Sequence, residues 1–190
     1  MRDVRQQFPL ITIGHSTLPL EAFLAALKDN GVKTLVDVRA FPGSRRYPHF
    51  GREALAQSVP AAGIAYQWMP ALGGRRKVSA ESQNGGWRNE SFRGYADYMQ
   101  TPEFEAGLDE LPQQAPVAYM CSESVPWRCH RSLISDALTA RGLAVEHIFV
   151  KPNGHSERRP HSMTPFARVE GGRVTYPAEQ PEIPFSAKAS

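Results

Sequence analysis

The sequence predicts a single three-layer α/β domain, with a mainly parallel sheet of about five strands, helices on both faces and a C-terminal β-hairpin. Short apolar runs alternate with amphipathic helical segments along most of the 190 residues, which suffice for one sizeable core. Near the end, two alternating segments flank a Gly-Gly turn, as in a hairpin over residues 166–176. We place the domain in residues 1–180 and expect residues 181–190 to form a disordered tail.

The N-terminal part predicts a strand, a helix and a second strand. Residues 10–13 are apolar, and the apolar side chains within residues 20–27 then fall on one helical face. Ser16 or Thr17 can cap this helix, and residues 34–39 form the next buried strand. A helix between two buried strands predicts a right-handed crossover, and therefore a parallel pair.

The middle of the chain holds one more strand and a long polar segment. Residues 51–59 fit a short helix, which Pro60 should end, and residues 64–68 fit a third strand. Residues 73–89 are rich in glycine and arginine. A loop of that length predicts either a functional lid or a flexible excursion.

The second half predicts two helices and then another strand, helix and strand. Residues 92–99 carry a helical apolar stripe, and Thr101 can cap a further helix that ends near residue 111. Residues 117–120 and 144–149 are apolar strands, and the helix between them has an apolar face over residues 133–138.

Several polar side chains follow the predicted strands and should meet at one edge of the sheet. His15 and Ser16 follow the first strand, Asp37 and Arg39 close the second, and Cys121 closes the fourth. The carboxyl ends of parallel strands lie at the same edge, where α/β proteins place their functional loops. We therefore expect a composite site there.

The loop after the fourth strand favours thiol chemistry, because it contains both cysteines of the chain. A thiolate near a helix N-terminus and basic side chains has a lowered pKa, so Cys121 is the candidate nucleophile. His15, His130 and Glu123 are the other candidate catalytic residues, and Cys129 is structural or a resolving partner. The alternative is that Cys121 is an inert apolar residue at a strand end.

The basic side chains around this edge favour an anionic ligand. Arginine binds carboxylates and phosphates in a bidentate manner, and a helix N-terminus adds donors and a favourable dipole. The alternative for these side chains is an ion-pair network, which would suit an adaptor protein. The candidate ligand-binding residues are Ser16, Asp37, Arg39, Ser44, Arg45, Arg128 and Arg131.

A metal centre is not predicted. Cys121, Cys129 and His130 are residue types that zinc accepts, with Glu123 or His15 as a further ligand. However, no Cys-x-x-Cys pair is present, and the adjacent side chains of Cys129 and His130 should point in different directions. We predict neither a metal nor a cofactor.

Composition agrees with a globular protein in the cytoplasm, since 41% of residues are hydrophobic and 22% are charged. No apolar run approaches the roughly 18 residues of a membrane span, so no membrane partner is expected. The net charge of +3 suits an anionic small molecule or nucleotide. It also leaves open a non-enzymatic nucleic-acid-binding protein that uses the basic, aromatic loops 39–50 and 73–93.

Several short motifs are spread along the chain: Ile13-Gly14-His15-Ser16, Asp37-Val38-Arg39 with Pro42, Ser44 and Arg45, Leu72-Gly73-Gly74, Cys121-x-Glu123 with Cys129-His130-Arg131, His147-Ile148, residues 161–164 and residues 172–176. Through these motifs most of the chain, about residues 10–177, resembles the bacterial domain-of-unknown-function family 488. The resemblance implies an α/β fold and a site at the cysteine loop, and no particular activity. The order of Asp37-x-Arg39 and Cys121 is faintly similar to rhodanese-like domains, although the loop here is longer.

Overall fold

The structure, a computed structural model, describes residues 8–43, 45–114 and 116–178. The strands are β1 (Leu10–Gly14), β2 (Thr34–Asp37), β3 (Ala65–Trp68), β4 (Val117–Cys121), β5 (Val145–Val150), β6 (Ser156–Pro160), β7 (Arg168–Glu170) and β8 (Arg173–Thr175). The α-helices are α1 (Leu20–Asp29), α2 (Arg52–Ala61), α3 (Glu90–Tyr98), α4 (Pro102–Glu110) and α5 (Arg131–Ala140). Short 3-10 helices are η1 (Pro48–Phe50), η2 (Pro70–Leu72), η3 (Leu111–Gln114) and η4 (Pro126–Arg128). The predicted disordered tail, residues 181–190, lies outside the described residues.

Six strands form the main sheet, in the order β3-β2-β4-β1-β5-β6. The five predicted strands are all present and parallel, so the predicted fold class is confirmed. The sixth strand, β6, pairs antiparallel with β5 at the edge. Its sequence, Ser-Glu-Arg-Arg-Pro, escaped prediction because an edge strand with exposed side chains carries no apolar pattern.

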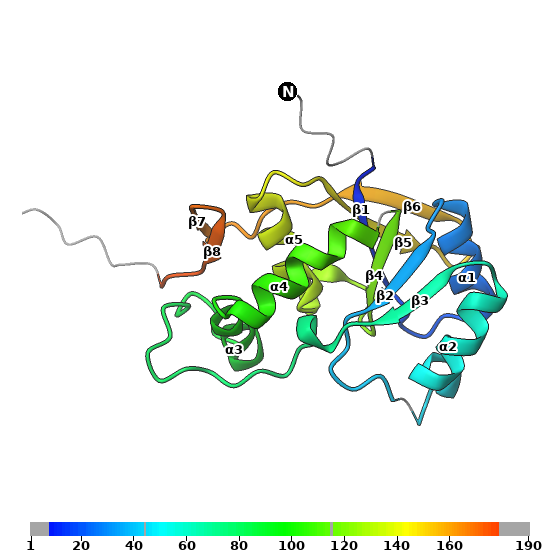
Figure 1. Ribbon diagram of the computed structural model, residues 1–190, viewed down its shortest axis with the longest axis horizontal. Helices are drawn as coiled ribbons and strands as arrows, with labels where there is room; N and C mark the ends of the chain where they lie inside the picture. Colours follow the sequence, from blue (N-terminus) through cyan, green and yellow to red (C-terminus); the bar gives the residue numbers. More distant parts are fainter. Residues whose placement is uncertain (1–7, 44, 115, 179–190) are drawn as a thin grey trace, which may run out of the picture.

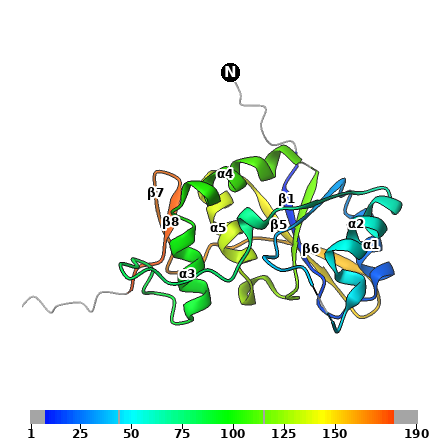
Figure 2. The same ribbon diagram turned by 60° about the horizontal axis from the view of Figure 1, so that its bottom comes forward.

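Helices cover both faces of the sheet, as Figures 1 and 2 show. On one face, α1 and α2 pack their apolar side chains on alternate residues of the strands, such as Ile13, Leu35 and Met120. On the other face, α3, α4 and α5 pack on residues such as Val36 and Tyr119. The alternation of the two cores along each strand follows from the two-residue period of a strand. None of the described helices has both the length and the apolar content to cross a membrane.

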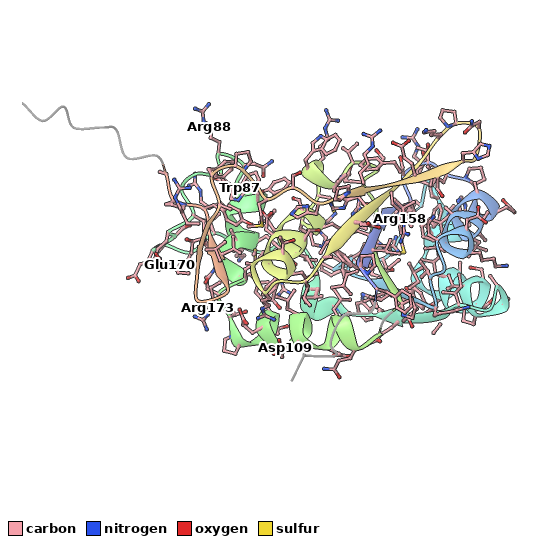
Figure 3. All side chains as sticks on the ribbon, turned by 90° about the horizontal axis from the view of Figure 1, so that it is seen from above. Trp87, Arg88, Asp109, Arg158, Glu170 and Arg173 are labelled. Carbon is pink, nitrogen blue, oxygen red and sulfur yellow. The ribbon has the colours of Figure 1, made fainter. Side chains whose placement is uncertain are left out.

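The predicted hairpin forms, but it does not extend the main sheet. Strands β7 and β8 pair only with each other and make a separate two-stranded sheet. In Figure 3, Glu170 and Arg173 of this hairpin lie at the same end of the molecule as Trp87, away from Arg158 of β6. Trp87 packs against Tyr176, with the ring centroids 5.5 Å apart, so the hairpin and the segment 73–89 share one cluster.

Residues 73–89 run along the protein surface without helix or strand, but they are tied to it. The side chain of Asn84 donates to Asp97 of α3 at 2.8 Å and accepts from the backbone N–H of Tyr176 at 2.8 Å. The guanidinium of Arg76 lies 3.6 Å from the ring centroid of Tyr98. These contacts bind the segment to α3 and to the hairpin.

Two predicted helix ends are wrong and one is confirmed. Pro19 occupies the N-cap of α1, without a side-chain cap hydrogen bond, so neither Ser16 nor Thr17 caps this helix. Helix α2 includes Pro60 and ends one residue later. A proline in the last turn removes one backbone N–H hydrogen bond and leaves the rest of the helix intact. Thr101 caps α4 as predicted and accepts from the backbone N–H of Phe104 at 3.3 Å.

Gly14, the last residue of β1, lies closer to the cysteine loop than any side chain would permit. A Cβ built on it would stand 1.7 Å from the carbonyl oxygen of Glu123 and 2.7 Å from a guanidinium nitrogen of Arg131. The backbone of the loop therefore rests directly on the end of β1. Glycine is required here for space, and not for a left-handed backbone conformation.

We expect Gly14→Ala to lower the free energy of unfolding by about 3 kcal/mol or more, because the loop backbone must move to admit the methyl group. Gly43→Ala is the matched control, since a Cβ there meets nothing within 4 Å. It should leave stability unchanged to within about 0.5 kcal/mol. Urea unfolding followed by circular dichroism measures both. Equal stability of the two variants would contradict the close approach at Gly14.

Candidate functional site

Two thiols and one imidazole converge where β4 leads into α5. Cys121 ends β4, and Cys129 and His130 directly precede α5. Nδ1 of His130 lies 3.9 Å from Sγ of Cys121 and 3.7 Å from Sγ of Cys129. Both cysteines are free and buried. The loop that the sequence analysis singled out thus contains a compact cluster, which we call the thiol cluster (Cys121, Cys129 and His130).

The backbone explains why adjacent side chains reach the same point. Cys129 is extended, with φ −140° and ψ 148°, whereas His130 is already helical, with φ −58° and ψ −12°. This change of conformation swings the two side chains toward each other, so the expectation that they diverge is wrong. Nε2 of His130 lies 2.9 Å from the carbonyl oxygen of Val38. A carbonyl can only accept, so Nε2 carries a proton and the neutral ring presents its Nδ1 lone pair to the sulfurs.

The two cysteines have opposite pKa shifts. A hydrogen bond with the Cys129 sulfur, together with burial, raises the pKa of Cys121. Burial also acts against the Cys129 thiolate, but the hydrogen bond from Cys121, the charge of Arg131 and the backbone N–H of Arg131 outweigh it and lower the pKa of Cys129. That N–H lies 3.5 Å from the Cys129 sulfur. Cys129 is thus the more acidic of the two thiols, whereas the sequence favoured Cys121 as the candidate nucleophile.

A cavity of about 160 Å³ opens beside the thiol cluster. Arg75 and Arg128 bring positive charge to its wall, and Glu123 brings a carboxylate. The other lining residues are Gly74, Ser91, Phe92, Tyr95 and the thiol cluster itself. This cavity gives the cluster access to a small molecule.

Sequence reasoning missed Gly74, Arg75 and Tyr95 as parts of this site. Tyr95 packs on the imidazole of His130 at 4.9 Å between centroids, although the sequence favoured core packing over stacking for this side chain. A Cβ on Gly74 would lie 3.1 Å from Nδ1 of His130, so glycine leaves room beside the cluster. The glycine- and arginine-rich composition of residues 73–89 was the available signal for their role.

A second polar group lies at the same edge, built on β2. The guanidinium of Arg39 donates from Nε at 2.8 Å and from Nη2 at 2.6 Å to the carboxylate of Asp37. Tyr66 donates to the same carboxylate, and the carbonyl oxygen of Phe50 accepts from Arg39. Asp37 and Arg39 are buried and satisfied by each other. In this group, the alternative of an ion-pair network describes the contacts better than an anion clamp.

His15 belongs to the Asp37–Arg39 group and not to the thiol cluster. Its ring stacks on Phe50 with centroids 4.2 Å apart, Nδ1 donates to the carbonyl of Ser16, and Nε2 faces Arg39 at 3.3 Å. Burial and the charge of Arg39 lower the pKa of His15 to about 4. The side chain is therefore neutral near pH 7, with both ring nitrogens in use.

Arg131, the first residue of α5, is fully buried and bonds inward. Nη1 donates to the hydroxyl of Thr12 at 2.9 Å, and Nη2 donates to the carbonyl of Glu123 at 2.5 Å. The side chain thus holds the cysteine loop to β1. Arg131 is not among the residues that line the cavity beside the thiol cluster.

A chain of hydrogen bonds continues from Arg131 through the interior. Thr12 contacts Nδ1 of His147 at 2.8 Å, and Nε2 of His147 contacts Nδ1 of His161 at 3.0 Å. Nε2 of His161 donates to Asp136 at 2.8 Å. With both rings neutral, one set of tautomers satisfies the chain, in which every proton points from Arg131 toward Asp136. Tyr176 donates to the same carboxylate from the hairpin end.

The remaining predicted binding residues lie apart from the thiol cluster. Ser16 has a positive φ of 46° and lines a different cavity, of about 470 Å³, with Thr17, Ser124 and Lys151. Arg45 is exposed in the loop before η1. Ser44 lies outside the described residues. Of the predicted site residues, the cavity thus brings together Cys121, Glu123, Arg128 and His130.

The thiol cluster also has the residue types of a metal site. The two Sγ atoms and a ring nitrogen of His130 all lie within 4.8 Å of one another. Zinc takes such ligands, usually four in a tetrahedron. The cluster therefore offers three ligands and a cavity at the fourth side.

The buried histidine of the internal chain makes stability depend on pH. Burial, with His161 and Arg131 nearby, lowers the pKa of His147 to about 3, whereas the ordinary value is 6.5. The unfolded state then takes up this proton first, so the stabilising contribution is complete above pH 6.5 and is lost as the pH falls toward 3. Asp136 is the acidic group at the end of the same chain.

We expect His147→Gln to remove about 2 kcal/mol of the loss in unfolding free energy between pH 7.5 and pH 4.5. Glutamine keeps polar atoms near Thr12 and His161 but does not titrate. His155→Gln, at an exposed histidine, is the control and should keep the wild-type slope. Denaturant unfolding at a series of pH values measures the slopes. An unchanged slope in His147→Gln would show that another group carries the dependence.

Comparison with protein families gives one match. The family model for the domain of unknown function DUF488 matches residues 19–138, which is more than half of the chain and includes the whole thiol cluster. The matched range is shorter than the expected 10–177 and stops before His147. Comparison with curated proteins and with solved structures finds no match, and the rhodanese-like similarity is not found. On the strength of this match, the chain belongs to the DUF488 family.

Proposed function

We propose that this protein is a cysteine-dependent enzyme that acts on an anionic small molecule, with Cys129 as the nucleophile. The observation that carries the proposal is the convergence of two thiols and the Nδ1 of His130 on a cavity with arginines in its wall. A thiol beside an imidazole and a helix N-terminus is the usual arrangement of an activated cysteine. Cys121, the nucleophile expected from the sequence, takes the role of hydrogen-bond donor to Cys129.

The cluster supports a simple group transfer. Nδ1 of His130 accepts the thiol proton of Cys129, and the resulting thiolate forms a bond to the electrophilic atom of the substrate. The bond to the leaving group breaks with its electron pair, and the leaving group receives the proton held by His130. An acceptor with an X–H group, such as water, then takes the transferred group from sulfur and returns its proton to the thiol through His130.

The charges at the cavity favour an anion. Arg75 and Arg128 lie in its wall, and the buried charge of Arg131 favours the thiolate of Cys129. Arg39, an expected anion ligand, is occupied by Asp37, and the guanidinium of Arg131 is occupied by Thr12 and Glu123. The proposal therefore gives substrate binding to Arg75 and Arg128. A cavity of about 160 Å³ admits a small molecule or the reactive end of a larger one.

The alternative, nucleic-acid binding through loops 39–50 and 73–93, receives less support from the contacts. Trp87 and Phe92 stack on each other with centroids 4.7 Å apart, and Arg76 packs on Tyr98. These side chains contribute to packing within the chain. For contact with a nucleic acid, the alternative depends on exposed side chains such as Phe41, which is 72% exposed.

The proposal is tested by comparing the rates at which the cysteines react with iodoacetate, which is negative, and with iodoacetamide, which is neutral. In each case the thiolate displaces iodide, so the two reagents differ in charge and not in the bond formed. We expect Cys129 to be modified before Cys121, as measured by peptide mass spectrometry. Arg75→Ala and Arg128→Ala should each slow iodoacetate about threefold or more while leaving iodoacetamide nearly unchanged. Glu123→Gln should accelerate iodoacetate, because it removes a negative charge from the cavity.

Arg173→Ala is the matched control, since this exposed arginine lies on β8, outside the residues that line the cavity. It should change neither rate. Modification of Cys121 before Cys129 would overturn the assignment of the nucleophile. Equal effects of Arg128→Ala and Arg173→Ala on the ratio of the two rates would overturn the anionic substrate.

A further inference from the structure

The thiol cluster has a geometry that its proposed catalytic use does not require. The two sulfurs and Nδ1 of His130 surround a common point, within 4.8 Å of one another, as ligands around a metal ion do. A nucleophile and its base need only one sulfur and one nitrogen. The second sulfur, of Cys121, donates to Cys129 in the proposed function and also gives the cluster a third metal-binding atom.

The two nitrogen–sulfur distances are close to those in a tetrahedral zinc site. Zinc binds sulfur at about 2.3 Å and nitrogen at about 2.0–2.1 Å, so sulfur and nitrogen ligands in a tetrahedron stand roughly 3.6 Å apart. Nδ1 of His130 lies 3.7 Å from the Cys129 sulfur and 3.9 Å from the Cys121 sulfur. Both nitrogen–sulfur distances therefore need to change by only a few tenths of an ångström to match such a site.

The orientation of His130 is fixed from outside the cluster. Nε2 donates to the carbonyl of Val38 at 2.9 Å, which leaves the lone pair of Nδ1 directed at the sulfurs. A ligand histidine in metalloproteins is usually held in this way, by a hydrogen bond from its other nitrogen to a carbonyl or a carboxylate. Tyr95 packs on one side of the ring, and Gly74 leaves space beside Nδ1.

The fourth side of the cluster is open. Cys121, Cys129 and His130 all line the cavity, so a water molecule or a ligand atom can complete the tetrahedron. Three protein ligands with an open position are typical of reactive rather than structural zinc sites. Two thiolates and an imidazole exclude the hard cations Mg²⁺ and Ca²⁺, which prefer oxygen ligands.

We propose that Cys121, Cys129 and His130 bind one Zn²⁺ ion, and that this ion blocks the nucleophilic thiolate. The binding itself follows from the ligand geometry alone. The block rests on the proposed function, because a sulfur that shares an electron pair with zinc is a much weaker nucleophile than a free thiolate. Zinc would thus regulate the same site that performs the chemistry.

The binding is tested on the full chain, purified under a reducing phosphine and freed of metal. Titration with Zn²⁺ against a coloured chelator should give one equivalent per chain. Cys121→Ser, Cys129→Ser and His130→Gln should each weaken binding about 100-fold or more, since each removes one of three ligands. His155→Gln is the matched control and should bind as the wild type does.

Cobalt gives a readout that does not depend on any variant. Co²⁺ bound to the wild-type chain should show thiolate-to-metal charge-transfer absorption and the intense visible bands of a tetrahedral site. If circular dichroism shows that a serine variant does not fold, this spectrum still tests whether the cysteines bind the metal. Binding below about one-tenth of an equivalent, or a spectrum without thiolate bands, would overturn the inference.

The zinc inference and the proposed function fail separately. One equivalent of Zn²⁺ should slow iodoacetamide at Cys129 at least tenfold, and a chelator should restore the rate. Selective alkylation of Cys129 without any zinc binding would overturn the zinc site and leave the function standing. Zinc binding together with unreactive thiols in the metal-free chain would overturn the function and leave the site standing. Zinc binding with an unchanged alkylation rate would overturn the block.

Discussion

A fully buried positive charge, the guanidinium of Arg131, is the constraint on which this structure depends. Its hydrogen-bond partners are neutral oxygens, the hydroxyl of Thr12 on β1 and the carbonyl of Glu123 in the cysteine loop. Burying a cation costs several kcal/mol unless charge and hydrogen bonds compensate it. The thiolate form of Cys129 compensates this charge, and the hydrogen bond from Cys121 together with the charge of Arg131 lowers the pKa of that thiol. Fold and site therefore stabilise each other.

This pairing explains why the loop lies so close to the sheet. The carbonyl of Glu123 must reach both the Arg131 guanidinium and the end of β1, and only glycine at position 14 permits that approach. The same contact brings Cys129 and His130 back toward Cys121 at the end of β4. The thiol cluster thus depends both on the residues of the loop and on the contacts that hold the loop against β1.

The fold was largely predictable because its signals are local. Each buried parallel strand is a short apolar run, and each helix shows its own apolar stripe, so five strands and both layers of helices follow from sequence periodicity. The exposed strand β6 and the cap at Pro19 were not predictable in this way. An edge strand needs no apolar side chains, and a cap is decided by how the chain enters the helix.

By itself, the sequence determined the fold class, the edge of the sheet that carries the polar residues, and the loop that contains both thiols. Tertiary structure alone decided which of these residues meet. It joined His15 to Arg39, His130 to the cysteines, and Arg75 to the cavity from a distant loop. Sequence spacing gives the period of an element but not the direction of a side chain in an irregular loop. It also cannot assign a charge between two thiols, because that depends on burial and on the position of Arg131.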